Sequence, residues 1–205
     1  MKYPLVAKVS GMTYGLSNEA HRVLLTKNKA KFTKSFRQNF EYVKCYHGTR
    51  LDDYEIKSVR KNGLVFPTKQ LITEKAKRRF QNDSDLQLDS RIEYFLEQYP
   101  LSKGVYVNLN INEFSASSSQ YLQYGSESLL PIADALSIEQ GGDFRRKLIQ
   151  FGKPCIVEID IPSVDIPDNE LLRIYEHVFN FWRECALFFK HSIKSSYIKH
   201  INILN

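Results

Sequence analysis

Residues 104–112, GVYVNLNIN, alternate between apolar and polar side chains along their length. In an extended chain the apolar side chains fall on one face, while Tyr106 and three asparagines fall on the other. Such alternation is typical of a β-strand that buries one face in a core and keeps the other face polar. The fold therefore has to contain a sheet that other elements cover on at least one side.

Apolar runs and patterns of helical spacing predict the remaining elements. Strands are expected at 42–47, 154–161 and 197–204, and helices at 17–30, 52–63, 68–82, 84–99 and 168–190; residues 117–137 are helical in content but interrupted at Gly125 and Pro131. These elements do not alternate as βαβ units, and neither GxGxxG nor GxxxxGK[ST] occurs. The sequence predicts one α+β domain built around a mainly antiparallel, split sheet.

Positive charge is concentrated near the N-terminus. Residues 1–44 carry nine Lys or Arg and two Glu, a balance of +7, whereas the rest of the chain carries 20 and 21, a balance of −1. We expect a basic helical extension over 1–41, followed by a main domain over 42–205. Residues 22–44 are candidates for binding RNA or DNA, because basic segments attract polyanions and interleaved aromatic rings can stack on bases.

The aromatic residues of this segment have a second interpretation. Phe32, Phe36 and Phe40 lie at i, i+4 and i+8, the spacing of a buried stripe along a helix. In that case the neighbouring lysines are only solvated. This interpretation is favoured over stacking on bases.

Several classes of protein are disfavoured by composition. The three cysteines are isolated from one another, and the histidines show no metal-binding spacing, so no disulfide framework and no metal are expected. Charged residues interrupt the most apolar stretch, and the N-terminus lacks the apolar core of a secretory signal. We expect a cytoplasmic protein that does not enter a membrane.

Residues 46–50, YHGTR, carry the strongest candidate for chemistry. His47 ends a predicted strand, where its imidazole can hydrogen-bond a sugar hydroxyl. Gly48 lets a flat ligand approach the backbone, and the Thr49 hydroxyl adds a polar contact. A histidine at the end of a strand can equally be a structural residue, and the residues alone leave both interpretations open.

The HGT motif followed by a short helix that ends at Gly63 resembles the NAD-binding signature of ADP-ribosyltransferases of the diphtheria-toxin and poly(ADP-ribose)-polymerase type. The resemblance extends over roughly 42–204, through YGSESL and FGKPCIVEIDIP. It implies a split antiparallel sheet with surrounding helices. It also implies that His47 contacts the adenosine-side ribose of NAD, and that the Gly48 backbone holds the nicotinamide amide.

The resemblance implies two further elements of the site. A tyrosine stacks on nicotinamide: Tyr106 is expected to line the pocket, and Tyr121 and Tyr124 are candidates for the stacking ring, with Tyr124 preferred because it precedes Gly125. A late-strand glutamate grips the nicotinamide ribose, but Ser196 stands at that position. Glu127 and Glu158 are possible substitutes, and Glu127 is preferred.

Arg50 has two possible roles, since its guanidinium can hold the NAD pyrophosphate or form a surface ion pair with a nearby carboxylate. The leading hypothesis is an NAD-dependent mono-ADP-ribosyltransferase that modifies a macromolecule, with nucleic acid slightly favoured over protein. A bacterial toxin or anti-phage effector, held in check by a protein inhibitor or antitoxin, is the expected setting. The alternatives are an NAD-dependent RNA 2′-phosphotransferase and a binding module without turnover.

Overall fold

The structure is a computed structural model that describes residues 3–5, 8–10, 13–15, 29–80, 88–98, 104–114, 119–180 and 186–204. For residues 3–5, 8–10, 13–15, 30, 91, 127, 140 and 177–180 it describes the backbone only. The helix predicted at 17–30 lies almost entirely outside the described residues.

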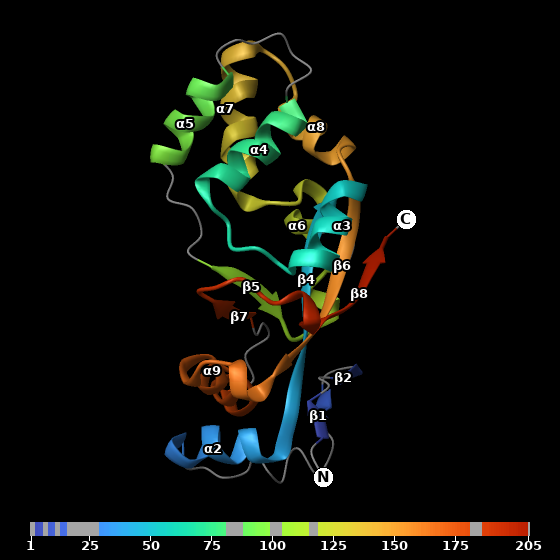
Figure 1. Ribbon diagram of the computed structural model, residues 1–205, viewed down its shortest axis with the longest axis vertical. Coiled ribbons are helices and arrows are strands. Elements are labelled where there is room, and N and C mark those ends of the chain that lie inside the picture. Colours follow the sequence, from blue (N-terminus) through green and yellow to red (C-terminus); the bar gives the residue numbers. More distant parts are fainter. Residues whose placement is uncertain are drawn as a thin grey trace.

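An antiparallel sheet forms the middle of the molecule (Figure 1). Its strand order is β7-β5-β4-β6-β8, with bounds Ala186–Phe189, Val105–Asn108, Phe40–Leu51, Lys153–Pro162 and Ile198–Ile203. A short strand β1, Tyr3–Leu5, pairs in parallel with β4, and β2, Lys8–Ser10, forms a separate hairpin with β3, Thr13–Gly15. The predicted α+β class with an antiparallel sheet is confirmed.

Strands β4 and β6 form the centre of the sheet. They pair continuously from Tyr42 opposite Pro162 to Leu51 opposite Lys153. Val43 and Cys45 on β4 and Val157 and Ile159 on β6 are fully buried. β-Branched side chains suit this pleated, enclosed surface, which explains why the chain is extended here. Both strands run longer than their apolar runs predict.

The alternating segment at 104–112 is a strand only in part. Val105, Val107 and Leu109 are buried as predicted, but β5 ends at Asn108 and Ile111 is exposed. The Asn110 side chain accepts the Asn112 backbone N–H at 2.9 Å, which turns the chain into the 3-10 helix η1, Ile111–Phe114. Asparagine favours such local turns because its side chain competes with the strand ladder for backbone donors.

Helix α3, Asp53–Asn62, follows β4 directly and has the predicted caps. The Asp52 side chain accepts the Glu55 N–H, and the Glu55 side chain accepts the Asp52 N–H, which is a complete capping box. Gly63 ends the helix at φ 80°, and a Cβ at this position would lie 1.9 Å from the Ile193 carbonyl oxygen. Backbone conformation and close packing therefore both require glycine here.

A layer of helices covers one end of the sheet, at the top of Figure 1. It contains α4, Lys69–Phe80; α5, Leu88–Gln98; α6, Gln120–Tyr124; the 3-10 helix η2, Glu127–Leu129; α7, Leu130–Gln140; and α8, Phe144–Gln150. These helices share a core of their own that includes Ile72, Phe80, Leu136 and Leu148. Pro131 does not interrupt this region, since it lies in the first turn of α7, where the missing N–H has no helical partner to lose.

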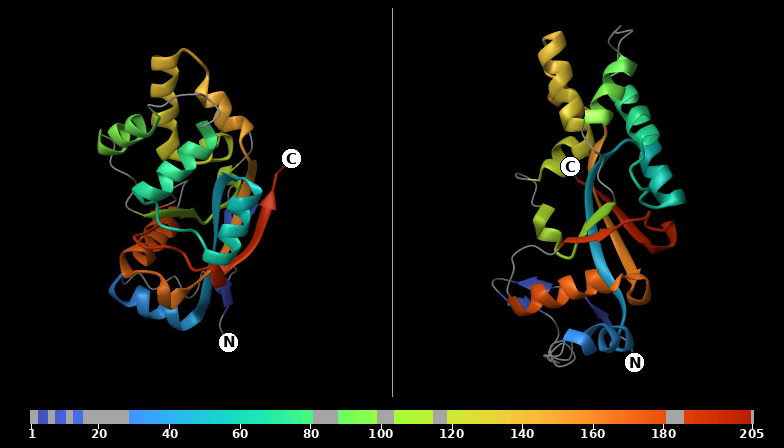
Figure 2. Two further views of the ribbon diagram at one scale, coloured as in Figure 1. Left: turned by 45° about the horizontal axis from the view of Figure 1, so that its top comes forward. Right: turned by 90° about the vertical axis from the view of Figure 1, so that its left-hand side faces the viewer.

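Two helices pack together at the opposite end of the molecule, as the right-hand view of Figure 2 shows. They are α2, Lys29–Asn39, and α9, Asp168–Asn180. Phe32, Phe36 and Phe40 are at most 1 % exposed and belong to the same core as the sheet. The predicted burial of the three rings is confirmed, although only Phe32 and Phe36 lie on α2 and Phe40 begins β4; stacking of these rings on bases is wrong. The domain boundary at residue 41 stays a prediction.

The long helix predicted at 168–190 is wrong at residues 186–189. Helix α9 is described over Asp168–Asn180, and Ala186–Phe189 form β7, antiparallel to β5. Leu187 and Phe189 point into the sheet core, while the Phe188 N–H donates to the Glu170 side chain of α9 at 2.9 Å. Tertiary pairing therefore overrides the helical spacing of these residues.

Candidate active site

A cavity of about 1180 Å³ lies where the sheet meets the helical layer. Its walls come from β4, α3, α4, β5, η1 and α6. His47, Gly48 and Thr49 all line it, so the HGT motif opens onto a large concave space. Large cavities with a few convergent polar groups are the usual ligand sites of proteins.

His47 bridges β4 and β5 at the point where the paired strands separate. In the ladder between the two strands, Tyr46 pairs with Asn108. Beyond this pair the two strands are linked by a side chain, because His47 Nδ1 lies 2.8 Å from the Tyr106 carbonyl oxygen. A carbonyl can only accept, so Nδ1 carries the hydrogen of this bond. Burial lowers the pKa of His47, the Tyr106 carbonyl opposes that change, and the nearby Lys75 lowers the pKa further. The lowered pKa favours the neutral ring, in which Nε2 is a hydrogen-bond acceptor.

Close packing requires a glycine at position 48. The group that packs against it is a protein side chain, whereas the sequence suggests a flat ligand. A Cβ on Gly48 would lie 2.4 Å from Cδ1 of Phe114 in η1. The buried Phe114 ring therefore sits directly on the Gly48 backbone and forms a small cluster with Leu122 and Ile156. Through this contact the motif on β4 fixes the position of η1.

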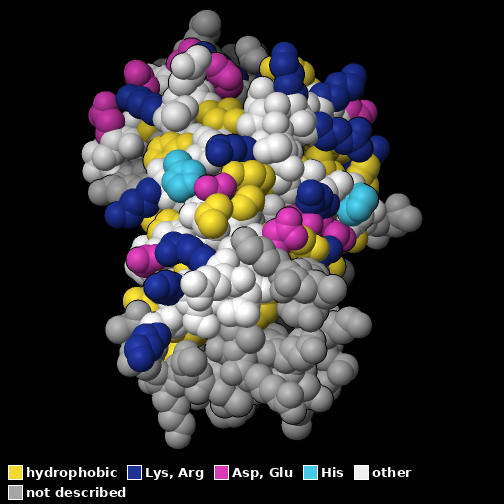
Figure 3. All heavy atoms as spheres, turned by 60° about the horizontal axis from the view of Figure 1, so that its bottom comes forward, with side chains coloured by type: hydrophobic (Ala, Val, Ile, Leu, Met, Phe, Trp, Pro, Cys, Tyr) yellow, Lys and Arg dark blue, Asp and Glu magenta, His cyan; other side chains and the backbone are white. Residues whose placement is uncertain are grey.

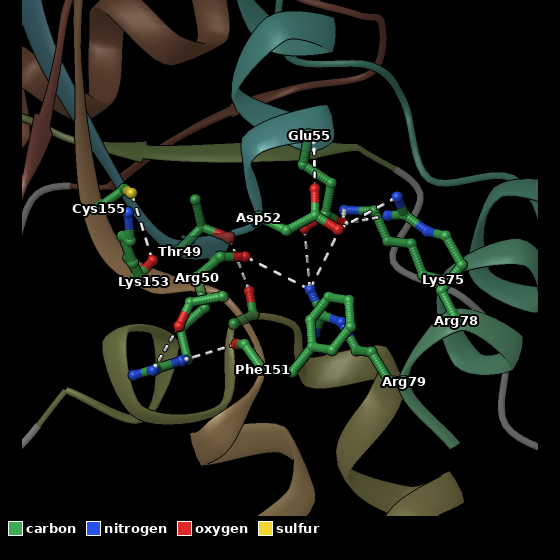
Figure 4. A network of polar contacts seen from close by, with 12 residues as sticks. Thr49, Arg50, Asp52, Glu55, Lys75, Arg78, Arg79, Phe151, Lys153 and Cys155 are labelled. Atoms are coloured by element: carbon green, nitrogen blue, oxygen red, sulfur yellow. Dashed lines mark hydrogen bonds and ion pairs between the residues drawn. The ribbon is translucent and has the colours of Figure 1, made fainter. Parts of the chain in front are cut away.

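Thr49 and Arg50 have structural partners (Figure 4). Thr49 Oγ1 donates to the Gly125 carbonyl at 3.0 Å. Arg50 donates from Nε to the Phe151 carbonyl at 3.2 Å, and from its two terminal nitrogens to the Leu122 and Gly152 carbonyls at 3.1 and 2.9 Å. Arg50 is not among the residues that line the cavity. Both predicted roles of Arg50 are corrected: its guanidinium ties the sheet to the loops around α6 and α8.

The predicted tyrosines separate into two groups. Tyr106, 46 % exposed, and Tyr121, 38 % exposed, line the cavity. Tyr124 does not: its ring packs against the core of the helical layer, and its side chain interacts with Arg145 of α8. The preference for Tyr124 over Tyr121 is therefore corrected. Helix α6 ends at Tyr124, and the residue that reaches the cavity lies one turn earlier.

Of the two carboxylates proposed as substitutes for the late glutamate, the structure describes the side chain of Glu158 only. Glu158 lies opposite Tyr46 on β6, accepts from the Asn202 side chain at 2.7 Å, and lies 3.8 Å from Lys44 Nζ. It does not line the cavity, and neither does the exposed Ser196. The backbone of Glu127 belongs to η2, but its side chain lies outside the described part of the structure.

A buried cluster of charges forms the wall between α3 and α4, and sequence reasoning did not find it. The Glu55 carboxylate lies 3.3 Å from Lys75 Nζ, 3.1 Å from Arg78 and 3.4 Å from Arg79 (Figure 4). Burial tends to raise the pKa of Glu55, but the three cations and the Asp52 N–H hold it below its usual value. Glu55, Lys75 and Arg78 line the cavity.

Two other polar residues of the cavity were missed as well. Glu113 of η1 is half-buried and lies 3.3 Å from the Asn110 amide through its Oε1. Ser119 is 6 % exposed, and its buried Oγ has no hydrogen-bond partner among the described residues. Buried hydroxyls normally have a partner, so Ser119 Oγ is a candidate for contact with a bound ligand. No local pattern marks either residue, because their proximity to the HGT motif depends on the turn after β5.

The remaining predictions about the site concern metals, membranes and relatives. No group of three His, Cys, Asp or Glu suited to a metal ion occurs within the described residues. None of the helices in the described ranges is both long and apolar enough to cross a membrane. Comparisons of the chain with family models, curated proteins and solved structures find no match.

Proposed function

We propose that the protein is an NAD-dependent mono-ADP-ribosyltransferase. The observation that carries this proposal is the placement of His47, two aromatic rings and a wall with Lys75 and Arg78 around one cavity. This combination suits a ligand that has ribose hydroxyls, a flat ring and a diphosphate. The HGT resemblance supplies the identity of that ligand, NAD.

Each part of NAD has a complementary group in the cavity. His47 Nε2 accepts a hydrogen bond from a ribose hydroxyl, and Tyr121 or Tyr106 stacks on the nicotinamide ring. Lys75 and Arg78 take the diphosphate, in place of Arg50. Guanidinium and ammonium groups that are already held by Glu55 need little rearrangement to receive phosphate oxygens. Ser119 Oγ offers one further polar contact.

The acceptor that we propose is a nucleic acid, for which residues 22–44 stay one candidate surface. Three cations of that segment pair internally: Lys29 with Glu176 at 2.6 Å, Arg37 with Asp168 at 2.6 Å, and Lys44 with Glu158. Exposed basic residues on α3 and β8 form an alternative, the α3–β8 patch: Lys57, Arg60, Lys61, Lys199 and His200. Figure 3 shows one face of the molecule, on which Lys and Arg side chains are numerous and lie among Asp and Glu side chains.

The α3–β8 patch is contiguous, because Arg60, Lys199 and His200 line one hollow of about 330 Å³ between α3 and β8. Helix α3 also forms a wall of the active-site cavity. The patch residues lie on another face of α3 from Tyr54, Glu55 and Ser58, which line the cavity, and the patch provides attraction without base recognition.

The test measures nicotinamide release from NAD by the purified protein, with and without RNA and single-stranded DNA. We expect release by the wild-type chain and loss of release in His47→Ala, whereas His200→Ala keeps NAD turnover because His200 lies outside the cavity. Calorimetry that finds no NAD binding to the wild-type chain would contradict the proposal. Circular dichroism and a urea melt establish that each variant is folded.

A second function is favoured by one observation. RNA 2′-phosphotransferases use NAD and rely on basic residues around the site, and Lys75 and Arg78 place two cations in this cavity wall. An assay with RNA that carries a 2′-phosphate distinguishes this function, because phosphate would leave the RNA only if NAD is present. Salt-dependent binding of nucleic acid without any consumption of NAD would instead identify a binding module.

A further inference from the structure

Exposed apolar side chains are concentrated around the cavity. Within the described ranges, ten large hydrophobic side chains are exposed, and four of them line this one cavity: Tyr54, Val65, Tyr106 and Tyr121. Grouped apolar surface marks a binding site, whereas single exposed side chains do not. The nicotinamide ring accounts for Tyr106 and Tyr121, which leaves Tyr54 of α3 without a ligand. At 71 % exposed, Tyr54 is the most exposed aromatic residue in the described part of the chain.

A guanidinium covers one face of the Tyr54 ring. Arg78 Cζ lies 4.9 Å from the centre of the ring, which is a cation–π distance. Asp52 and Glu55 hold this guanidinium in turn, at 3.2 and 3.1 Å from its terminal nitrogens (Figure 4). The position of Arg78 therefore does not depend on the ring. Since the ring is largely exposed although Arg78 covers one face, its other face is open to a ligand.

A ring that is held on one face and open on the other is a platform for a second flat ring. Nucleobases suit such a platform, because each of them has a π face that stacks on an aromatic side chain, and an arginine adds a cation–π contribution. Stacking of this kind does not depend on the base sequence. The bases of a single strand are accessible to it, whereas the bases inside a duplex are already stacked on one another.

The wall beside Tyr54 keeps an excess of positive charge. Lys75, Arg78 and Arg79 of α4 pair with two carboxylates, Asp52 and Glu55. Helix α4 as a whole carries five Lys or Arg and one Glu. This excess attracts a polyanion, and a neutral peptide gains nothing from it. At about 1180 Å³ the cavity also exceeds the roughly 300 to 1,000 Å³ of a usual small-molecule site, which leaves room for part of an acceptor beside NAD.

We infer that Tyr54 and Arg78 form a stacking site for a base of a single-stranded nucleic acid, the acceptor in the proposed function. The role as an acceptor site rests on that proposed function, whereas the binding of the strand does not. The plane of the guanidinium contacts the ring and its N–H edge is available to phosphate, so this role is compatible with the binding of NAD. The α3–β8 patch attracts a polyanion without holding a base, and Tyr54 supplies a base contact on the face of α3 that lines the cavity.

The test measures binding by fluorescence anisotropy, with labelled single-stranded RNA and DNA of about 12 nucleotides and with the duplex of the same sequence. We expect Tyr54→Ala to weaken the binding of the single strands about 5- to 150-fold, the range for loss of one base stack. Tyr54→Phe keeps the ring and should bind them as the wild-type chain does. Tyr94→Ala is the matched control and should also bind as the wild-type chain does, because Tyr94 of α5 is 60 % exposed but does not line the cavity.

Two further measurements identify the contact that is lost. The phenol of Tyr54 carries no charge at neutral pH, so the slope of log Kd against log salt in Tyr54→Ala should equal that of the wild-type chain. A smaller slope would contradict stacking, because it would mean that the substitution acts through the neighbouring cations. Calorimetry with NAD should show a smaller loss of affinity in Tyr54→Ala than the loss for the single strand. An equal or larger loss for NAD would assign the ring to the adenine of NAD and overturn the inference.

The outcomes separate this inference from the proposed function. A wild-type chain that binds no single strand overturns the inference, whatever the chain does with NAD. A wild-type chain that binds single strands through Tyr54 but neither binds nor cleaves NAD supports the stacking site and overturns the proposed function. Unchanged binding in Tyr54→Ala, an equal loss in Tyr94→Ala, or duplex binding with the same dependence on Tyr54 would each overturn the stacking site alone.

Discussion

Replacement of Gly48 by alanine would place a methyl group inside the van der Waals radius of the Phe114 ring. The added Cβ would lie 2.4 and 2.5 Å from two ring carbons, Cδ1 and Cε1. Carbon atoms in contact are normally about 3.5 to 4.0 Å apart, so the ring has to retreat by more than about 1 Å. Phe114 is buried against Leu122 and Ile156 and also lines the cavity, so the ring has to give up part of this packing to move away.

Overpacking of this kind costs about 1 to 3 kcal/mol of the free energy of unfolding. For a chain of this size each kcal/mol lowers the melting temperature by about 2 to 4 °C, so we expect a decrease of about 2 to 12 °C. Urea melts and thermal melts of Gly48→Ala measure both quantities. Gly142→Ala is the control, because the new Cβ meets only the Phe144 ring at 3.4 Å. It should be neutral or stabilise the protein by about 0.4 to 1 kcal/mol through the unfolded chain.

A double-mutant cycle with Phe114→Leu identifies the cause of the expected loss. The smaller side chain removes the clash, so the two substitutions together should cost less than the sum of the single variants, with a coupling of about 0.5 to 3 kcal/mol. Strictly additive losses would refute the reasoning, because they would mean that Phe114 does not determine the need for glycine. An unchanged melting temperature in Gly48→Ala would refute it as well.

Three further substitutions test other parts of the structure. Arg50→Met removes the donors to three backbone carbonyls and should lower the free energy of unfolding by about 3 kcal/mol or more. The control Arg60→Met, at an exposed position, should change it by at most about 0.5 kcal/mol. Urea melts of the two variants measure this difference. Phe32→Ala should lower the free energy of unfolding by about 3 to 5 kcal/mol, because the ring is buried. The neighbouring Lys31 is exposed, so Lys31→Ala should leave the free energy of unfolding almost unchanged. Equal effects of the two substitutions would mean that α2 does not contribute to the core. Burial lowers the pKa of His47 in the folded chain. At a pH below about 6.5 the unfolded chain therefore binds a proton more readily than the folded chain does. The free energy of unfolding should decrease as the pH falls through this range. His47→Gln removes this group, and the difference in stability between about pH 7.5 and about pH 5.5 should be smaller in the variant; an identical difference would show that His47 titrates normally.

Features determined by neighbouring residues could be predicted from the sequence. The capping box at Asp52 and Glu55 and the end of α3 at Gly63 depend on residues that are close together in the sequence. The Phe32, Phe36 and Phe40 stripe and the strand at Val105 and Val107 follow from periodicity alone. His47, Gly48 and Thr49 line the cavity because they follow one another on a single strand.

Features determined by distant residues could not be predicted in the same way. Arg50 is held by carbonyls about 70 to 100 positions away, so no local pattern reveals that its donors are occupied. Residues 186–189 are helical by spacing but pair with β5, a partner that only the folded sheet supplies. Tyr121 and Tyr124 are equivalent in the sequence, and the difference between them arises from the helical layer against which Tyr124 packs.

The large apolar cores of the sheet and of the helical layer meet at a polar seam, beside the small apolar cluster of Phe114, Leu122 and Ile156. Arg79 of α4 reaches Glu55 and the carbonyl of Arg50, while Thr49 reaches Gly125; one guanidinium atom, Arg79 Nε, has no partner among the described residues. Because water can replace polar contacts of this kind, separating the cores costs less than opening either one. The helical layer should therefore exchange its amide protons as one cooperative unit, before β4 and β6 do.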